Sequence, residues 1–123
     1  MSTDWKTISH APAADTFVCG VEDILDAGGR EVAFGDGKEP FRLMLLRRKE
    51  LVWAYHNSCP HFSLPLNFEP QHFIALDGEL VMCAHHAAFF NFDDGMCVDG
   101  PCAGTRLLSV PIRLSDGKVF IAS

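Results

Sequence analysis

The sequence predicts an all-β domain, either a sandwich or a small barrel, from closely spaced turn signals and the short β-type runs between them. Most of the turn signals are Asp-Gly pairs. Because Gly and Asp tolerate positive φ angles, an Asp-Gly pair between apolar segments is a strong signal for a β-hairpin. The turn signals are Gly28-Gly29, Asp36-Gly37, Asp77-Gly78, Asp94-Gly95, Asp99-Gly100 and Asp116-Gly117.

The runs between these turns are a few residues long and rich in aliphatic and aromatic side chains, as β-strands usually are. In chain order the predicted strands are Phe17–Val21, Glu31–Phe34, Phe41–Leu46, Leu51–Tyr55, Leu80–Met82, Phe89–Phe92, Leu107–Leu114 and Val119–Ala122. Residues Val21–Ala27 are expected to form one or two helical turns that end at Gly28. Nothing else in the sequence reads as a long amphipathic helix.

The length and composition predict one globular domain over residues 1–123, with 48% apolar and 21% charged residues. No apolar run approaches the roughly 18–20 residues that span a bilayer, so we expect no membrane partner. The N-terminus lacks a cationic segment followed by an apolar one, and no signal peptide is therefore expected. These features together predict a cytoplasmic location.

The formal net charge of −6 argues against nucleic acid as a partner, because phosphate binding requires a basic face. An acidic surface could steer the protein toward basic partners at low ionic strength. It could equally serve solubility alone, and the sequence leaves both interpretations open.

Five cysteines in a cytoplasmic chain of this size indicate metal ligands or buried thiols rather than a disulfide framework. Three of them, Cys19, Cys97 and Cys102, lie outside the motifs described next and are predicted to be packed or partly exposed free thiols. Cys97 and Cys102 could pair, but a reducing compartment argues against a disulfide.

Two short motifs carry the strongest chemical signal in the sequence. One is a C-x-H motif from Cys59 to His61, and the other is a C-x-x-H motif from Cys83 to His86. Together they supply two thiolates and two imidazoles. This ligand set fits a [2Fe–2S] cluster in which Cys59 and Cys83 hold one iron and two His replace Cys on the other.

Each ligand motif follows a predicted strand, Leu51–Tyr55 for the first and Leu80–Met82 for the second. On extended backbone the C-x-H spacing places both side chains on one face, because side chains alternate with a period of two. The C-x-x-H spacing needs a turn to do the same. Two such loops can close over a cluster from opposite sides, and the Gly- and Pro-rich segment 99–104 can shield it from water.

A structural zinc site is the main alternative, because Zn²⁺ also accepts two Cys and two His. Structural zinc sites usually show C-x-x-C pairs, which are absent here.

His85 lies beside His86 and is interpreted as a neighbour of the site rather than a ligand. The remaining histidines His10, His56 and His72 are interpreted as surface or packing residues, and Arg47-Arg48-Lys49 as a solvated turn.

The motifs resemble those of the Rieske family, in particular its soluble ferredoxin-type members, over essentially the whole chain. Residues His61–Leu66 fit a first loop that often reads C-P-H-x-x-x-P-L, and Cys83–Asn91 fit a second loop that usually reads C-P-x-H-G-x-x-F-D. Gly100-Pro101 and Pro111–Ile121 are similar to the family's Pro loop and closing hairpin. The resemblance implies an antiparallel β-sandwich with a cluster-binding subdomain inserted at about residues 57–104.

Three departures from the family pattern leave all four ligands in place. Residues 62–82 make the spacing between the two motifs longer than usual, and the extra length is expected near 67–74, where it could shape a partner surface. Ala87 replaces the usual Gly after the second His, and would be strained by about 1 kcal/mol if the position needs positive φ. Ala84 replaces a common Pro.

The resemblance also bears on the reduction potential, which ranges from about −150 to +300 mV among these clusters. High-potential respiratory members carry Ser and Tyr hydroxyl donors where this chain has Ala88 and Phe90, and a Cys pair where it has Leu64 and His85. Hydrogen bonds to the sulfurs tune the potential. The missing donors therefore predict a potential at the low end of the range.

Three functions are consistent with these features. The first is a stand-alone one-electron carrier that takes electrons from a flavin reductase and passes them to a terminal oxygenase or a similar acceptor. The second is a small electron-transfer subunit of an enzyme complex such as assimilatory nitrite reductase. The third is a module without electron transfer, either zinc-bound or redox-sensing. In each case the chain is expected not to be an enzyme by itself.

Overall fold

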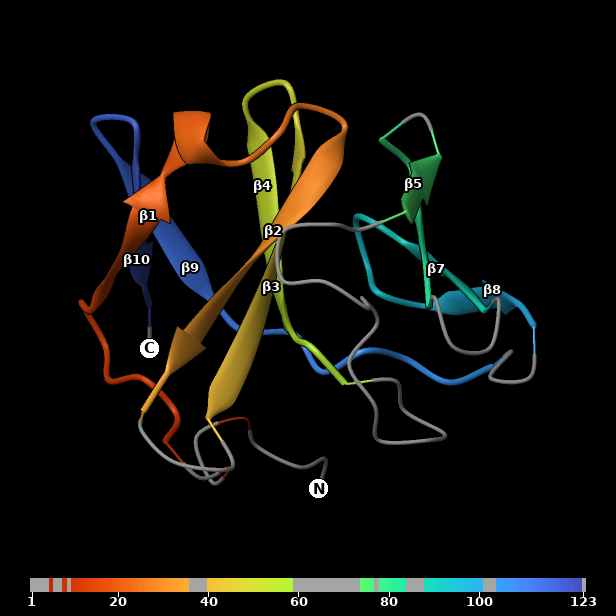
Figure 1. Ribbon diagram of the computed structural model, residues 1–123, viewed down its shortest axis with the longest axis horizontal. Coiled ribbons are helices and arrows are strands. Elements are labelled where there is room, and N and C mark those ends of the chain that lie inside the picture. Colours follow the sequence, from red (N-terminus) through yellow and green to blue (C-terminus); the bar gives the residue numbers. More distant parts are fainter. Residues whose placement is uncertain are drawn as a thin grey trace.

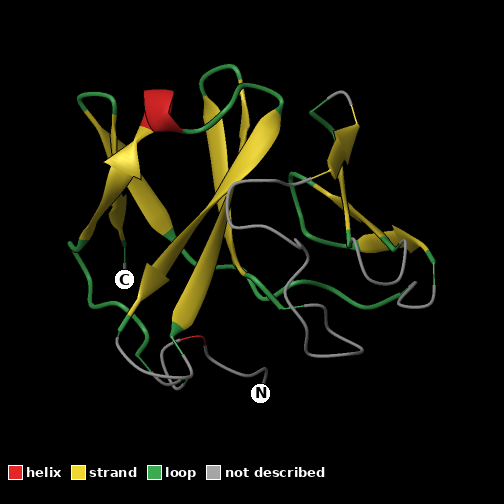
Figure 2. Ribbon diagram, viewed as in Figure 1, coloured by secondary structure: helices red, strands yellow, loops and turns green. Residues whose placement is uncertain are grey.

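The structure is a computed structural model that describes Trp5, Ile8 and residues 10–35, 40–58, 74–76, 78–83, 88–100 and 104–122. Within these residues, strands dominate and one short 3₁₀ helix interrupts them, as Figure 2 shows. The elements are β1 (Phe17–Gly20), η2 (Val21–Asp23), β2 (Gly28–Phe34), β3 (Phe41–Arg48), β4 (Leu51–His56), β5 (Ile74–Leu76), β6 (Leu80–Met82), β7 (Phe89–Asn91), β8 (Cys97–Asp99), β9 (Ile112–Ser115) and β10 (Lys118–Ile121).

The strands form three antiparallel sheets, in the orders β1-β10-β9, β2-β3-β4 and β5-β6-β7-β8. In the view of Figure 1 the sheet β2-β3-β4 lies in the middle, with the other two on either side of it. The β5–β8 sheet comes from the chain between β4 and β9, so it is an insertion between strands of the other two sheets. The predicted all-β fold class is therefore confirmed.

The middle sheet is covered on both faces, and alternate residues of β3 point into the core on one side or the other. Leu43 and Leu45 belong to an apolar core shared with β1 and β10, whose Val119 and Ile121 are fully buried. We call this the sandwich core. Met44 on the same strand belongs instead to a second core, which the β5–β8 sheet covers.

The second core, which we call the inner core, joins the middle sheet to the inserted sheet. Besides Met44 and Leu46 from β3 and Tyr55 from β4, it contains Val81, Cys83, Ala88, Phe90, Phe92, Cys97 and Leu107. Trp53 and Ala75 pack against it at its edge. Tyr55, Phe90 and Phe92 thus pack between the middle and inserted sheets, which Figure 1 shows side by side.

The Asp-Gly signal of the last hairpin acts as predicted. β9 and β10 are joined by Asp116 and Gly117, with φ angles of 51° and 73°. Positive φ at both central residues of a two-residue hairpin loop is the geometry that matches the twist of the flanking strands. The register Ser115↔Lys118 follows from this turn.

Several predicted boundaries were wrong. The helical segment is shorter than expected, because η2 ends at Asp23 and Gly28 already opens β2. Arg47 and Arg48 do not form a turn but end β3, where the Arg48 guanidinium lies 5.2 Å from the centre of the Trp53 ring. Residues 107–110 lack the predicted strand apart from a single bridge between Tyr55 and Ser109.

Two strands were missed, β5 and β8, each of three residues at the outer edges of the inserted sheet. β5 contains Ala75 and β8 ends at Asp99, both poor strand formers, so neither segment stands out as a β-type run. As for helices, none within the described residues is long and apolar enough to cross a bilayer.

Candidate metal centre

The second ligand motif begins where β6 ends. The β6–β7 pairing runs from Leu80↔Asn91 to Met82↔Phe89, and one further hydrogen bond extends it, from the Cys83 N–H to the Ala88 carbonyl oxygen at 2.8 Å. Cys83 is therefore held by a regular hairpin at the base of the segment 84–87. This places one expected ligand on rigid backbone, which is how precise sites are built.

Cys83 is completely buried in the inner core, among Val81, Ala88 and Phe90. The thiolate form of a cysteine in apolar surroundings needs a positive partner, because an isolated buried charge is very costly. Coordination to a metal supplies that partner and deprotonates the thiol. The donor chemistry and the surroundings of Cys83 thus fit a metal–thiolate bond.

The first ligand motif begins just after β4, and the structure describes the chain up to the residue before it. Three backbone hydrogen bonds hold this exit: His56 N–H donates to the Leu108 carbonyl at 2.8 Å, Asn57 N–H to the Arg42 carbonyl at 2.8 Å, and Ser58 N–H to the His56 carbonyl at 2.9 Å. The strand therefore ends in a fixed conformation that directs the chain into Cys59.

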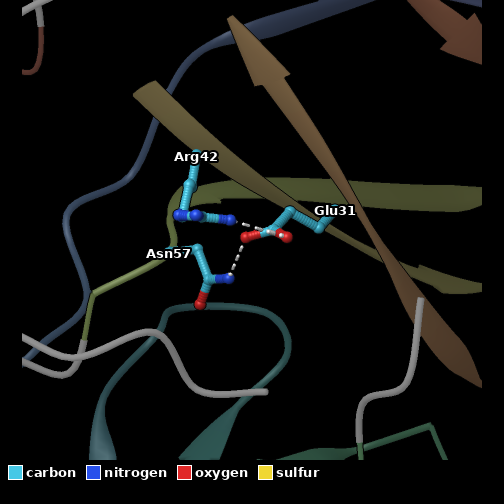
Figure 3. Close-up of polar contacts among 3 residues, drawn as sticks. All are labelled: Glu31, Arg42 and Asn57. Atoms are coloured by element: carbon cyan, nitrogen blue, oxygen red, sulfur yellow. Dashed lines mark hydrogen bonds and ion pairs between the residues drawn. The ribbon is translucent and has the colours of Figure 1, made fainter. Parts of the chain in front are cut away.

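Side chains reinforce this exit. The Asn57 Nδ2 donates to Oε2 of Glu31 at 2.8 Å, and the Arg42 Nη1 donates to Oε1 of the same carboxylate at 3.3 Å (Figure 3). Glu31 and Asn57 are both buried. Sequence reasoning missed this cluster; the available signal was a Glu within an otherwise apolar predicted strand.

The two ligand-bearing regions are joined by Tyr55 on β4. Its hydroxyl donates a 2.6 Å hydrogen bond to the Phe92 carbonyl, just beyond β7. Burial, together with the nearby Asp94 and Asp93 carboxylates, raises the pKa of Tyr55 well above its ordinary value. Gly95 packs so closely on this ring that a Cβ there would meet Tyr55 Cε1 at 2.7 Å. The ring is thus clamped between the middle and inserted sheets.

Backbone hydrogen bonds also join the residues at the two ends of segment 99–104, which is expected to shield the site. Cys97 N–H donates to the Thr105 carbonyl at 2.8 Å, and Gly104 N–H to the Cys97 carbonyl at 3.3 Å. Gly100 and Gly104 have φ angles of 103° and 92°, which non-glycine residues rarely adopt. The described ends of this loop therefore come together beside β8.

Of the other predicted thiols, Cys19 is a free cysteine in the sandwich core, and burial raises its pKa to about 11. It is packed, as expected. Cys97 is buried in the inner core.

Two of the histidines that were interpreted as surface or packing residues are described by the structure. His10 is exposed, and His56 packs against Phe41 with ring centres 5.0 Å apart, as predicted.

Several predicted residues, among them three of the four expected ligands, lie outside the described part of the chain. They are Cys59, His61, Leu64, His72, Ala84, His85, His86, Ala87 and Cys102, together with all of segment 67–74 except Ile74. Among the residues that are described, no three His, Cys, Asp or Glu side chains are grouped so as to hold a metal ion.

Comparison with solved structures gives close matches in fold. The ferredoxin of Sphingomonas yanoikuyae B1 matches with a TM-score of 0.66 at 25% identity, over 89% of this chain and 98% of that one. A chain from the complex of reduced oxygenase and oxidized ferredoxin in carbazole 1,9a-dioxygenase matches with a TM-score of 0.68 at 24% identity, over 86% and 90% of the two chains.

A larger protein matches only in part. The terminal oxygenase of carbazole 1,9a-dioxygenase from Nocardioides aromaticivorans IC177 has a TM-score of 0.70 at 21% identity, but the match covers 87% of this chain and 29% of the oxygenase. No curated protein sequence matches. The model of the Rieske [2Fe-2S] domain matches residues 15–115, and this chain therefore belongs to the Rieske [2Fe-2S] domain family.

Proposed function

We propose that this protein is a one-electron carrier that uses a Rieske [2Fe–2S] cluster to pass electrons from a reductase to a terminal oxygenase or a similar acceptor. The observation that carries the proposal is the extent of the structural match. The chain corresponds to 98% of a ferredoxin but to only 29% of a terminal oxygenase. The matched region thus corresponds to a carrier domain, and the proposal includes no catalysis by this domain.

The proposed ligands are Cys59 and Cys83 on one iron and His61 and His86 on the other. The burial of Cys83 at the end of a regular hairpin supports its assignment, and the fixed exit of β4 supports that of the first motif. When bound, the cluster accepts and releases single electrons. In this proposal the residues from about 57 to 104 form the cluster-binding subdomain.

The protein itself contributes the surroundings of the cluster. Ala88 and Phe90 are fully buried next to Cys83 in the inner core and have no hydroxyl group to donate to a sulfur. Donors to the sulfurs raise the potential of such clusters. We therefore propose a midpoint potential in the lower part of the range of about −150 to +300 mV.

The partners proposed are redox proteins, namely a flavin reductase as donor and a terminal oxygenase as acceptor. Ferredoxin and oxygenase crystallised together in the carbazole 1,9a-dioxygenase system, and this chain resembles a component of that complex. The net charge of −6 favours a basic partner surface. The proposal keeps the cytoplasmic location expected from the sequence.

The test is reconstitution of electron transfer. The protein is mixed with the reductase and oxygenase encoded nearest its gene, and product formation is followed with and without it. We expect turnover to require the protein, to fail with Cys83→Ala, and to slow as salt is added. Turnover without the protein would contradict the carrier function. Copurification of the protein in a stable complex with a reductase would instead favour the role of an enzyme subunit.

A further inference from the structure

Glu31 is a buried carboxylate in an unusual position. It lies on β2 opposite Met44 of β3, on the face of the middle sheet that forms the inner core, and is 6% exposed. Burial of a charge is costly unless the charge is paired and hydrogen-bonded. Both carboxylate oxygens have partners here, Arg42 on one and Asn57 on the other (Figure 3).

Asn57 is held at two points. Its side chain donates to Glu31 at 2.8 Å and its backbone N–H donates to the Arg42 carbonyl at 2.8 Å. The paired residues of β3 and β4 end at Leu43↔His56, so these two bonds hold the chain one residue beyond the ladder. Asn57 is only 2% exposed, and the chain enters the first ligand motif two residues later.

We propose that Glu31 is a positioning residue for the iron–sulfur cluster: through Asn57 it fixes the point at which the chain leaves β4 for Cys59. This inference rests on the proposed function, because it concerns the same cluster. It assigns to a residue of β2, remote in sequence from both ligand motifs, control over how firmly the cluster is held.

The chemistry requires a carboxylate rather than a side chain of similar shape. An ionised carboxylate only accepts hydrogen bonds, so it can serve Arg42 and Asn57 together. A glutamine at position 31 would present an amide NH₂ group to one of these two donors. Glu31→Gln therefore changes almost no volume but turns an NH₂ group toward Arg42 or Asn57 and so breaks one of the two contacts.

The experiment compares cluster-loaded variants by their EPR g-values and by the rate at which a chelator removes iron. For Glu31→Gln we expect shifted g-values and iron loss about tenfold faster, a fold-change equivalent to about 1.4 kcal/mol. The double variant Glu31→Gln/Asn57→Asp reverses donor and acceptor, because the new Gln amide can donate to the new Asp. We expect it to recover much of the original spectrum and rate.

Two controls separate positioning from general stability. Glu50→Gln makes the same chemical change at an exposed site in the β3–β4 turn and should alter neither readout. Val119→Ala, in the sandwich core, should lower the free energy of unfolding but leave the g-values unchanged. If Glu31→Gln behaves like Val119→Ala, with reduced stability and an unchanged spectrum, the proposal is overturned.

If Glu31→Gln does not fold, Arg42→Gln replaces it, because the Arg42 side chain is 42% exposed and its removal is better tolerated. A smaller shift of the g-values in the same direction would support the proposal, and an unchanged spectrum and rate would overturn it. Cluster binding by the unmodified protein separates failure of the proposed function from failure of this inference. If it binds no cluster, the proposed function has failed; if it binds a cluster that Glu31 does not affect, only this inference has failed.

Discussion

The two cores on either side of the middle sheet are built differently. On one side, the four-residue strands β1, β10 and β9 cover the middle sheet across the sandwich core. On the other side, the inserted sheet has strands of only three residues. Short strands have few ladder hydrogen bonds, so the inserted sheet depends more on side-chain anchors and, in our proposal, on the cluster.

The contrast shows that one sheet can perform two tasks. Tyr55 and His56 are neighbours on β4, yet the first lies in the inner core and the second packs against Phe41 of the sandwich core. The sandwich provides stability, and its other face presents a rigid surface for the inserted sheet.

The largest effect is expected from Cys83→Ala, which removes a proposed ligand. We expect complete loss of the iron–sulfur absorbance and faster amide hydrogen exchange in β5–β8, while the sandwich strands stay protected. The matched control is Cys19→Ala, since Cys19 is buried in the sandwich core. It should bind the cluster normally. Retention of the cluster by Cys83→Ala would show that the ligand assignment is wrong.

A pair of buried phenylalanines tests the difference in stability. Phe41 in the sandwich core and Phe90 in the inner core are both fully buried. Replacement of either by Ala should cost about 3–5 kcal/mol. For Phe41→Ala we expect a loss of global stability in urea; for Phe90→Ala, faster amide exchange that is confined to the inserted sheet. Identical exchange patterns for both variants would mean that the two cores unfold as one unit.

Alkaline pH should weaken the inner core through Tyr55. Its pKa is raised in the folded state, so this group contributes stability that is full below its ordinary pKa of 10 and is lost as pH rises above it. Tyr55→Phe should lower stability by about 1–2 kcal/mol at neutral pH and flatten the decline above about pH 10.

Tyr55 is the only tyrosine in the sequence, so the ultraviolet absorbance of tyrosinate reports it alone. Native protein should show no tyrosinate at a pH where the unfolded chain is ionised. Cys19 adds an alkaline decline of the same sign, but it is present in both proteins being compared and cancels. Ionisation of native Tyr55 near its ordinary pKa would argue against the buried anchor.

Acid pH should have the smallest effect, through His56. Burial lowers its pKa, so the unfolded chain binds the proton first and stability is lost as pH falls below about 6.5. His56→Gln should reduce this slope by a few tenths of a kcal/mol per pH unit, measured by urea unfolding between about pH 7 and pH 5. An unchanged slope would show that protonation of His56 is not coupled to folding.

The sequence predicted the all-β class and most of the strands because Asp-Gly turns and apolar runs are local signals. It missed β5 and β8 because these edge strands contain Ala75 and Asp99, which are poor strand formers, so no local signal marks them. The motif containing Cys83 was visible as a spacing, and the role of Cys83 as a ligand stays a prediction. The contacts of Glu31 with Asn57 were not predictable, since they join residues 26 positions apart that only the strand register brings together.

Binding of a Rieske cluster by this chain is tested by an EPR spectrum of the dithionite-reduced protein, with iron and acid-labile sulfide counted on the same sample. We expect a Rieske-type signal, with a mean g-value below that of [2Fe–2S] proteins ligated by Cys alone, and about two irons per chain. A silent spectrum from anaerobically purified protein that holds one zinc and no sulfide would contradict it.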